Sequence, residues 1–302
     1  MVKIGALINF CSNEYPFLSH CLSHLKPICS QIIVSVCDHY YNGKKEDLST
    51  LKKIYSEFPN VTFIQYPYLG NTISKKAKKK KGGRVFDGIS RTIGASFLDE
   101  DTDYVLFMDA DEIIDTERFL DFIKTESLEG LQAAKFSNYW YFREPKYRSQ
   151  TFEDSILLAK KSALSKKVLF GKDDRDGIFQ RIKGNKKREM TFNNKPLFHH
   201  YSWVRTKDQM LRKVLSWGHR SERDWAFLVE EEFSRDFNGK DFVHGYSFDV
   251  VEPYIEIDLL KKPTKKPKDI LNNLLSISEK KALKTISIPM LLRSYLPFTK
   301  TS

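Results

Sequence analysis

The first 108 residues alternate short apolar segments with segments of helical periodicity, and this alternation restricts the fold more than any other feature of the sequence. Four apolar segments, several of them rich in β-branched residues, predict buried strands, and the segments between them carry apolar residues at helical spacing. We expect strands at 3–9, 31–37, 61–66 and 104–108, and helices at 15–27, 46–58 and 86–98. Such alternation is typical of a parallel sheet with helices on both faces, which binds ligands at the carboxyl ends of its strands.

The second half of the sequence follows a less regular pattern. A helix is expected at 117–124, aromatic-rich and apolar strands at 132–142 and 155–160, and helices at 206–217 and 225–229. We therefore expect an α/β protein whose sheet is mostly parallel in its first half and mixed in its second.

The length of 302 residues permits one large α/β domain with a short addition. We divide the domain into halves at 1–120 and 121–258. The remaining range, 259–302, begins with a linker rich in lysine and proline and continues as a weakly amphipathic helical appendix.

Composition places the chain among globular proteins and leaves the meaning of its charge open. Hydrophobic residues make up 41% of the sequence and charged residues 29%, which is the balance of neither a disordered nor a membrane protein. The formal net charge of +11 favours polyanions, anionic membranes or phosphorylated substrates as partners. The lysine-rich segments, such as 75–81, are either solvated loops or parts of a binding surface.

Three features of the sequence bear on the compartment. No stretch reaches the roughly 18 apolar residues of a membrane-spanning helix, and the first nine residues do not predict a signal peptide. The four cysteines lie within the first 37 residues without metal-type spacing, so we expect them to be reduced. We predict a cytoplasmic protein, with peripheral contact to an anionic membrane through the basic clusters and segment 286–298 as a further hypothesis.

Two carboxylates follow the fourth predicted strand. Asp109 and Asp111 point to the same side of an extended segment, at the sheet edge where ligands bind. Oxygen ligands beside a diphosphate suit Mn²⁺ or Mg²⁺. The alternative is that these residues and Glu112 cap a helix at 113–124, because acids favour helix starts.

The segment Tyr-Val-Leu-Phe-Met-Asp-Ala-Asp-Glu at 104–112 resembles the Asp-x-Asp strand of family 2-like glycosyltransferases with the GT-A fold. The resemblance covers residues 1–120 well and the later half only through scattered motifs. It implies a Rossmann-like GT-A fold whose first half binds a nucleotide-diphosphate sugar and whose second half binds the acceptor.

The same resemblance implies roles for residues outside the motif. Asn9 and Glu14 belong to the turn that contacts the nucleotide after the first strand, and Asp38 meets the base or ribose. Arg91 faces the diphosphate, and Asp109 contacts both donor and metal. Asp38 and Arg91 are equally consistent with ordinary loop and helix-surface positions.

The family often supplies a late histidine as a further metal ligand, and Phe-His-His-Tyr-Ser-Trp at 198–203 is similar to that segment. His200 is favoured over His199 as the metal ligand, because the following Tyr-Ser-Trp aligns better with the family's segment in that register. His219 is a weaker candidate for the same role. Paired histidines beside aromatic residues are also common in protein cores.

An inverting transferase needs a carboxylate that deprotonates the acceptor hydroxyl. Asp154 is the predicted base, because Glu153-Asp154 resembles an acidic pair of the family. Four other acids remain open as alternatives, namely Asp173, Asp174, Asp176 and Asp224.

The sequence therefore predicts a metal-dependent glycosyltransferase that moves a sugar from a nucleotide-diphosphate donor to a glycan or lipid-linked acceptor, more consistent with inversion than with retention. Aromatic residues at 139–142 and the tryptophans beyond them could line an acceptor cleft or simply pack in the core. Two other classes remain open: a basic nucleic-acid-binding protein or metal-dependent nuclease, and a catalytically inactive glycan-binding relative.

Overall fold

The computed structural model describes residues 2–73, 82–170 and 174–286. Its centre is a parallel sheet in the order β3-β2-β1-β4, with β12 beside β3. The bounds of these strands are β1 Ile4–Phe10, β2 Gln31–Cys37, β3 Thr62–Tyr66, β4 Tyr104–Asp109 and β12 Leu274–Ser276. Because β1 and β4 lie in register, Asn9 is the partner of Asp109 at the carboxyl edge.

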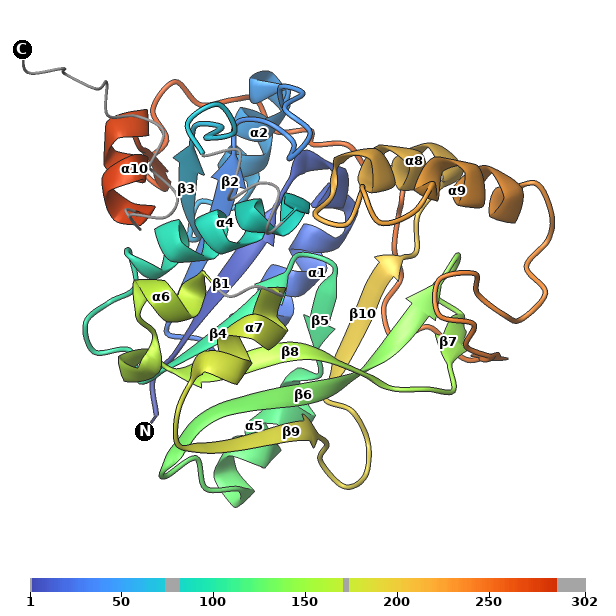
Figure 1. The fold of residues 1–302 in the computed structure, drawn as a ribbon, viewed down its shortest axis with the longest axis horizontal. Coiled ribbons are helices and arrows are strands. Elements are labelled where there is room, and N and C mark those ends of the chain that lie inside the picture. Colours follow the sequence, from blue (N-terminus) through green and yellow to red (C-terminus); the bar gives the residue numbers. More distant parts are fainter. Residues whose placement is uncertain (1, 74–81, 171–173, 287–302) are drawn as a thin grey trace, which may run out of the picture.

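Helices cover both faces of this sheet, which explains why its strands are apolar at nearly every position. On one face, Ala6 and Ile8 of β1 pack in a cluster with α1, α2 and α5; on the other, Leu7 packs with α4, α6, α7 and α10. Figure 1 shows α4, α6 and α7 lying across one side of the sheet. The bounds are α1 Tyr15–Leu25, α2 Leu48–Glu57, α4 Val85–Ala95, α5 Thr116–Thr125, α6 Lys166–Leu169, α7 Asp174–Arg181 and α10 Glu279–Ile286.

The second half of the sheet is mixed. β8 joins the parallel half by pairing antiparallel with β4, and β6 pairs with β8, β7, β9 and β10. β10 also pairs with β5, which places the segment after the acidic turn beside the histidine pair. The bounds are β5 Glu112–Ile114, β6 Leu131–Phe142, β7 Tyr147–Ser149, β8 Glu153–Lys160, β9 Asn185–Met190, β10 Phe198–Trp203 and β11 Phe248–Val250.

A separate aromatic core lies under the helical hairpin α8 (Lys207–Ser216) and α9 (Trp225–Phe233). Its members include Trp140, Trp203 and Trp225. In Figure 1 this hairpin lies beyond the ends of β1 and β10. The remaining elements are the short 3₁₀ helices η1 (Ser12–Glu14), η2 (Gly82–Arg84) and η3 (Lys161–Ala163).

The predicted α/β architecture, with a mostly parallel sheet, helices on both faces and a mixed second half, is confirmed. The C-terminal range contributes more to this sheet than its pattern indicates. Within it, β12 extends the parallel sheet beyond β3, and α10 packs against α4. Residues 75–81 and nearly all of segment 286–298 lie outside the described residues, so their predicted roles stay predictions.

Candidate active site

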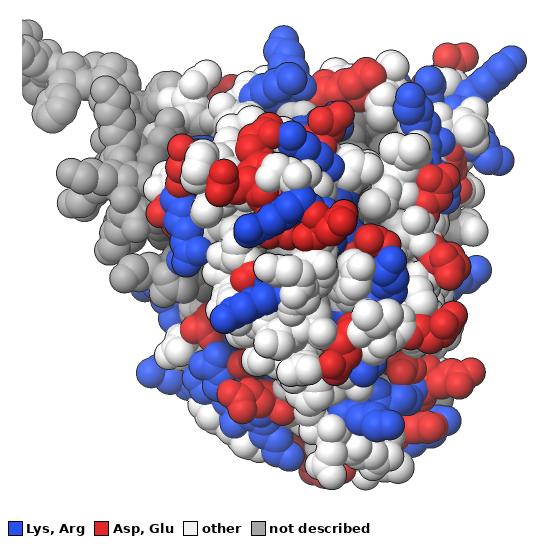
Figure 2. All heavy atoms as spheres, turned by 90° about the vertical axis from the view of Figure 1, so that its right-hand side faces the viewer, with Lys and Arg blue, Asp and Glu red and all other residues white. Residues whose placement is uncertain are grey.

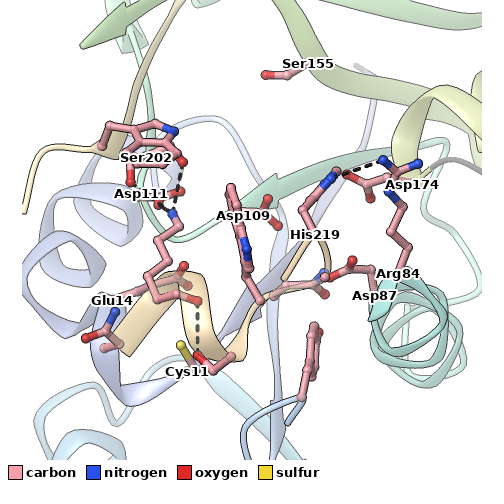
Figure 3. A pocket seen from close by; sticks show the side chains of 18 of the residues that line it. Cys11, Glu14, Arg84, Asp87, Asp109, Asp111, Ser155, Asp174, Ser202 and His219 are labelled. Atoms are coloured by element: carbon pink, nitrogen blue, oxygen red, sulfur yellow. Dashed lines mark hydrogen bonds and ion pairs between the residues drawn. The ribbon is translucent and has the colours of Figure 1, made fainter. Parts of the chain in front are cut away.

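A cavity of about 480 Å³ opens at the carboxyl ends of β1, β2 and β4. Its other walls come from β8, β10 and the segment joining α8 to α9. All four tryptophans of the chain line it, namely Trp140, Trp203, Trp217 and Trp225. In Figure 3, Asp111 and Glu14 lie on one side of the cavity and Asp174, Asp87 and Arg84 on the other, with Asp109 between them. The cavity therefore combines charged groups at strand ends with an aromatic wall.

The acidic turn after β4 belongs to this cavity and does not cap a helix. Asp109 ends β4 and Glu112 begins β5, while α5 starts only at Thr116. The N-cap of α5 is Asp115, whose carboxylate accepts a hydrogen bond from the Arg118 backbone N–H. The helix-cap alternative is therefore wrong for Asp109, Asp111 and Glu112, because a strand separates them from the helix.

Glu112 and Arg175 form a buried ion pair at the base of the site. The side chain of Glu112 is fully buried and that of Arg175 is 5% exposed. Both guanidinium NH₂ groups donate to the carboxylate, at 2.5 and 2.6 Å. Glu112 also accepts a hydrogen bond from the Asp109 backbone N–H at 2.7 Å. This bidentate pair fixes the conformation of the acidic turn.

Asp109 faces the cavity between two arginines. Its carboxylate lies 3.6 Å from Arg91 and 3.4 Å from Arg175, and its side chain is 30% exposed. Burial raises the pKa of Asp109 to about 6, with Arg175 and Arg91 opposing the shift and Glu112 adding to it. Asp109 therefore stays ionised at neutral pH.

Asp111 is almost completely buried and shares one oxygen between two cations. Its Oδ2 lies 2.8 Å from the guanidinium of Arg205 and 2.8 Å from the ammonium of Lys213. Burial by itself would raise the pKa of Asp111, but Lys213, Arg205 and His200 outweigh it and lower the pKa below its usual value. Asp111 is thus a fixed anion.

The residues as placed do not form a divalent-cation site around the predicted ligands Asp109, Asp111 and His200. Arginine or lysine side chains already lie beside both carboxylates, and their positive charges would repel a divalent cation. Within residues 2–73, 82–170 and 174–286, no group of three or more His, Cys, Asp or Glu side chains is arranged to hold a metal ion. The positive charge beside Asp111 comes instead from Arg205 and Lys213.

Asn9 and Glu14, the predicted nucleotide-contacting residues, both line the cavity. The side-chain amide nitrogen of Asn9 is buried and has no hydrogen-bond partner among the described residues. Burial, with a contribution from Asp111, raises the pKa of Glu14 to about 8. Lys213 and Arg205 oppose this shift, and the Arg205 guanidinium lies 3.7 Å from the Glu14 carboxyl. The raised pKa favours the protonated carboxyl, which can donate a hydrogen bond to a ligand.

Asp38 and Arg91 lie behind the cavity wall. The Asp38 carboxylate accepts a hydrogen bond from the Tyr68 backbone N–H and lies 2.6 Å from His39 Nδ1, while His39 itself lines the cavity. Arg91 is 2% exposed and contacts Asp109 and Asp174, which both line the cavity. Each of the two residues positions a neighbour that faces the cavity.

Asp154, the predicted base, faces away from the cavity. Side chains of a strand alternate between two faces, and Glu153 and Ser155 are the residues of β8 that line the cavity. The Asp154 carboxylate lies 2.9 Å from Arg188 and 3.6 Å from Lys135 on the other side. Glu153 is consequently the carboxylate of this acidic pair that a bound substrate could reach.

The acids that remained open as alternative bases lie at different places in the structure. Asp174 lines the cavity in an ion pair with Arg91, and Asp176 pairs with Lys135 and Arg188 outside it. Asp224 is the N-cap of α9. Asp173 lies outside the described residues.

His200 faces the cavity and His199 does not. The His200 ring lies 3.8 Å from Asp111 and Glu112 and 3.7 Å from Glu153. Burial lowers its pKa, but Glu153, Glu112 and Asp111 together raise it above the usual value. His199 stacks on Tyr254 at 3.8 Å in the core, where burial lowers its pKa to about 3.

The segment between α8 and α9 closes one side of the cavity. Trp217, His219 and Arg223 of this segment line it. Arg84 of η2 holds the segment through hydrogen bonds to His219 at 3.1 Å and Glu222 at 2.7 Å. This wall therefore depends on contacts between two loops that lie far apart in the sequence.

Sequence reasoning missed Lys213, Arg205, Arg175 and Glu153 as site residues. Lys213 and Arg205 lie about a hundred residues after Asp111, and no local pattern links them to it. Arg175 has acidic neighbours on both sides in the sequence Asp-Asp-Arg-Asp. The composition of such a charged segment is typical of an exposed loop and does not indicate a buried site residue. Strand alternation implies that only one residue of the pair Glu153-Asp154 faces the cavity, but the sequence does not indicate which one.

Comparison with known proteins gives similarity of fold only. No protein-family model matches the sequence, and no curated protein matches it. Among solved structures, the chain is similar to S. aureus TarS 1–349, with 13% identity over 78% of this chain and 73% of that one and a TM-score of 0.41. The chain is also similar to the catalytic domain of Drosophila β1,4-galactosyltransferase 7 in complex with xylobiose. The identity is 12% over 66% of this chain and 71% of that one, and the TM-score is 0.34.

A nucleotidyltransferase is similar to a comparable extent. For 4-diphosphocytidyl-2C-methyl-D-erythritol synthase from Anaerococcus prevotii, the identity is 14%, the coverage 62% of this chain and 88% of that one, and the TM-score 0.39. At TM-scores below 0.5 none of these similarities decides a function.

Proposed function

We propose that this protein is a glycosyltransferase that moves a sugar from a nucleoside-diphosphate donor to an acceptor hydroxyl. One observation carries the proposal: the Asp-x-Asp turn at the end of β4 opens into the same cavity as the end of β1 and the tryptophan-rich wall. Parallel sheets bind nucleotides at these strand ends, and aromatic side chains stack on sugar faces. The cavity thus offers adjoining regions for donor and acceptor.

In this proposal Asn9, Glu14 and Asp109 bind the donor. Asn9 carries a buried amide nitrogen that is free to donate, and burial raises the pKa of the Glu14 carboxyl, which favours its hydrogen-bond-donating form. Asp109 is the most exposed carboxylate of the acidic turn and can accept hydrogen bonds from ribose hydroxyls.

Glu153 is the proposed general base in place of Asp154. Its carboxylate lies 3.2 Å from His244 and 3.7 Å from His200, and it shares the cavity with both histidines. The acceptor hydroxyl gives its proton to Glu153 while its oxygen forms a bond to the anomeric carbon. The bond from that carbon to the diphosphate breaks, and its electron pair leaves with the diphosphate, so the configuration inverts.

The nucleic-acid alternative lacks a surface of the expected kind on the face seen in Figure 2. On that face, basic and acidic side chains of the described residues are interspersed. Nucleic-acid-binding proteins instead gather Lys and Arg along one stripe or patch. A metal nuclease would in addition need a cluster of metal ligands, which the described residues do not contain.

Membrane contact and a lipid-linked acceptor stay predictions. Within the described ranges, every helix is too short or too polar to span a bilayer.

The test is a donor screen followed by a transfer assay on the full chain. UDP, GDP, CDP and ADP, and their sugar conjugates, are titrated by thermal shift, because a ligand that binds the native state raises the melting temperature. The preferred nucleotide sugar is then incubated with glycan acceptors, and released nucleoside diphosphate is measured. Nucleoside triphosphates with sugar phosphates serve as a separate arm, in which pyrophosphate release would identify a nucleotidyltransferase.

Variants of the acidic pair test the assignment of the base. Glu153→Gln should lower kcat by about 10²–10⁴-fold without weakening donor binding. Asp154→Asn is the matched control, since its carboxylate lies on the other face of β8. Equal losses of kcat in the two variants would remove Glu153 as the base, and absence of binding by all nucleotides would remove the proposed function.

A further inference from the structure

Lys213 contacts Asp111, one of the carboxylates that the sequence predicts as a metal ligand. It lies in the last turn of α8, lines the cavity and is 12% exposed. Its ammonium is surrounded by Asp111 Oδ2 at 2.8 Å, Ser202 Oγ at 3.0 Å and the Ser202 backbone oxygen at 3.1 Å. Three oxygens around one cationic centre, beside the cavity, resemble the protein half of a coordination shell.

Neutralising Asp111 does not require Lys213. Arg205 is fully buried, donates to the same Asp111 oxygen at 2.8 Å and is held there by the backbone oxygens of Tyr201 and Ser202. The Asp111 carboxylate therefore has two cationic partners, and Arg205 lies in addition 3.7 Å from the Glu14 carboxyl. Of the two cations, Lys213 is the one that reaches the cavity.

We propose that the Lys213 ammonium binds the donor diphosphate and takes the part of a divalent cation, so that donor binding by this protein is independent of metal. This inference rests on the proposed function. When the bond to the anomeric carbon breaks and its electron pair stays on the diphosphate, Lys213 lies where that charge accumulates. Two of its three N–H groups contact Ser202, a neutral residue, and can exchange that contact for phosphate oxygens.

With Lys213 in place, a divalent ion at Asp111 would lie within a few ångströms of two positive charges, those of Arg205 and Lys213. Like charges at that separation repel strongly in a buried site. The arrangement around Asp111 thus disfavours Mn²⁺ or Mg²⁺ as long as Lys213 keeps its position.

The experiment measures the Kd of UDP, GDP, CDP and ADP by titration calorimetry, once with Mn²⁺ and once with excess chelator. Wild type is expected to bind its preferred nucleotide with the same Kd in both conditions. Lys213→Met should weaken binding by about 10- to 100-fold, the usual loss for a hydrogen bond to a charged group, whereas Lys213→Arg should keep most of it. Mn²⁺ paramagnetic resonance should detect no tight site in wild type.

Lys207→Met is the matched control, because Lys207 lies on the same helix, pairs with Glu230 and is 42% exposed. It should bind like wild type. Lys213→Met keeps the Arg205–Asp111 pair, and an unchanged melting temperature would show that the fold is intact. A nucleotide that binds only with Mn²⁺, or equal Kd values for Lys213→Met and wild type, would overturn the role of Lys213 and leave the transferase proposal standing. If no nucleotide binds in either condition, both proposals fail.

Discussion

Removal of the Arg175 guanidinium should destabilise the protein far more than removal of an equally well paired arginine on its surface. Arg175→Met leaves Glu112 as a fully buried carboxylate without its cationic partner. Removing one partner of a buried ion pair costs about 3–5 kcal/mol, because the remaining charge stays desolvated. Met fills much of the volume of the arginine stem, so this loss comes mainly from the charge.

The size of the thermal shift follows from the length of the chain. With an unfolding entropy of about 2.1 cal/mol/K per residue over 302 residues, a loss of 3–5 kcal/mol lowers the melting temperature by about 5–8 °C. Differential scanning calorimetry measures this shift, and urea denaturation gives the corresponding change in the free energy of unfolding.

Arg188→Met is the control that separates the effect of burial on stability from the effect of losing an ion pair. Arg188 also contacts two carboxylates, Asp154 at 2.9 Å and Asp176 at 2.8 Å, but it is 44% exposed. Exposed pairs contribute about 0–1 kcal/mol, so this variant should lose little stability. The double variant with Glu112→Gln should regain part of the loss caused by Arg175→Met. Equal effects of Arg175→Met and Arg188→Met would refute the reasoning from burial.

Three further predictions concern stability. Because the pKa of Glu14 is raised from 4.5 to about 8, the folded state holds a proton that the unfolded state has released between these pH values, so stability should fall as pH rises through this window. Urea denaturation should show that Glu14→Gln removes roughly 2–4 kcal/mol of this fall between pH 5 and 8; an unchanged pH slope would contradict the assignment. Gly94→Ala would place Cβ 2.5 Å from Ser35 Oγ and should cost about 1–3 kcal/mol in the same assay, more than Gly88→Ala on the same helix, where the nearest contact is 3.3 Å. Thr206→Ala removes the capping box of α8 and should cost about 1 kcal/mol, while Thr206→Ser should not.

The parallel half of the fold was predictable because burial on both faces leaves a direct trace in the sequence. Strands such as Ile4–Phe10 are apolar at nearly every position, and the intervening helices carry apolar residues at helical spacing. The position of Asp109 and Asp111 at a ligand-binding edge follows from that pattern, since it depends only on where β4 ends.

Two features of the site were not predictable from local sequence: which residue of the pair Glu153-Asp154 faces the cavity, and which cation contacts Asp111. Whether Glu153 or Asp154 faces the cavity depends on the register of β8, and a shift of one residue reverses the faces. Pairing of β6 with β8 contains an irregularity beside Asp154, which no pattern in the sequence indicates. Lys213 meets Asp111 only because α8 folds back over the end of the sheet, a contact that depends on tertiary packing.

The pairing of β12 with β3 has a consequence for the order of events during synthesis. β3 leaves the ribosome early, yet the strand that covers its outer edge follows roughly 210 residues later. At about 5–20 residues per second, that edge waits about 10–40 s for its partner. During this interval β3 presents unsatisfied backbone groups to any other nascent chain nearby. We therefore expect the risk of aggregation through this edge to be highest during synthesis, before β12 has formed.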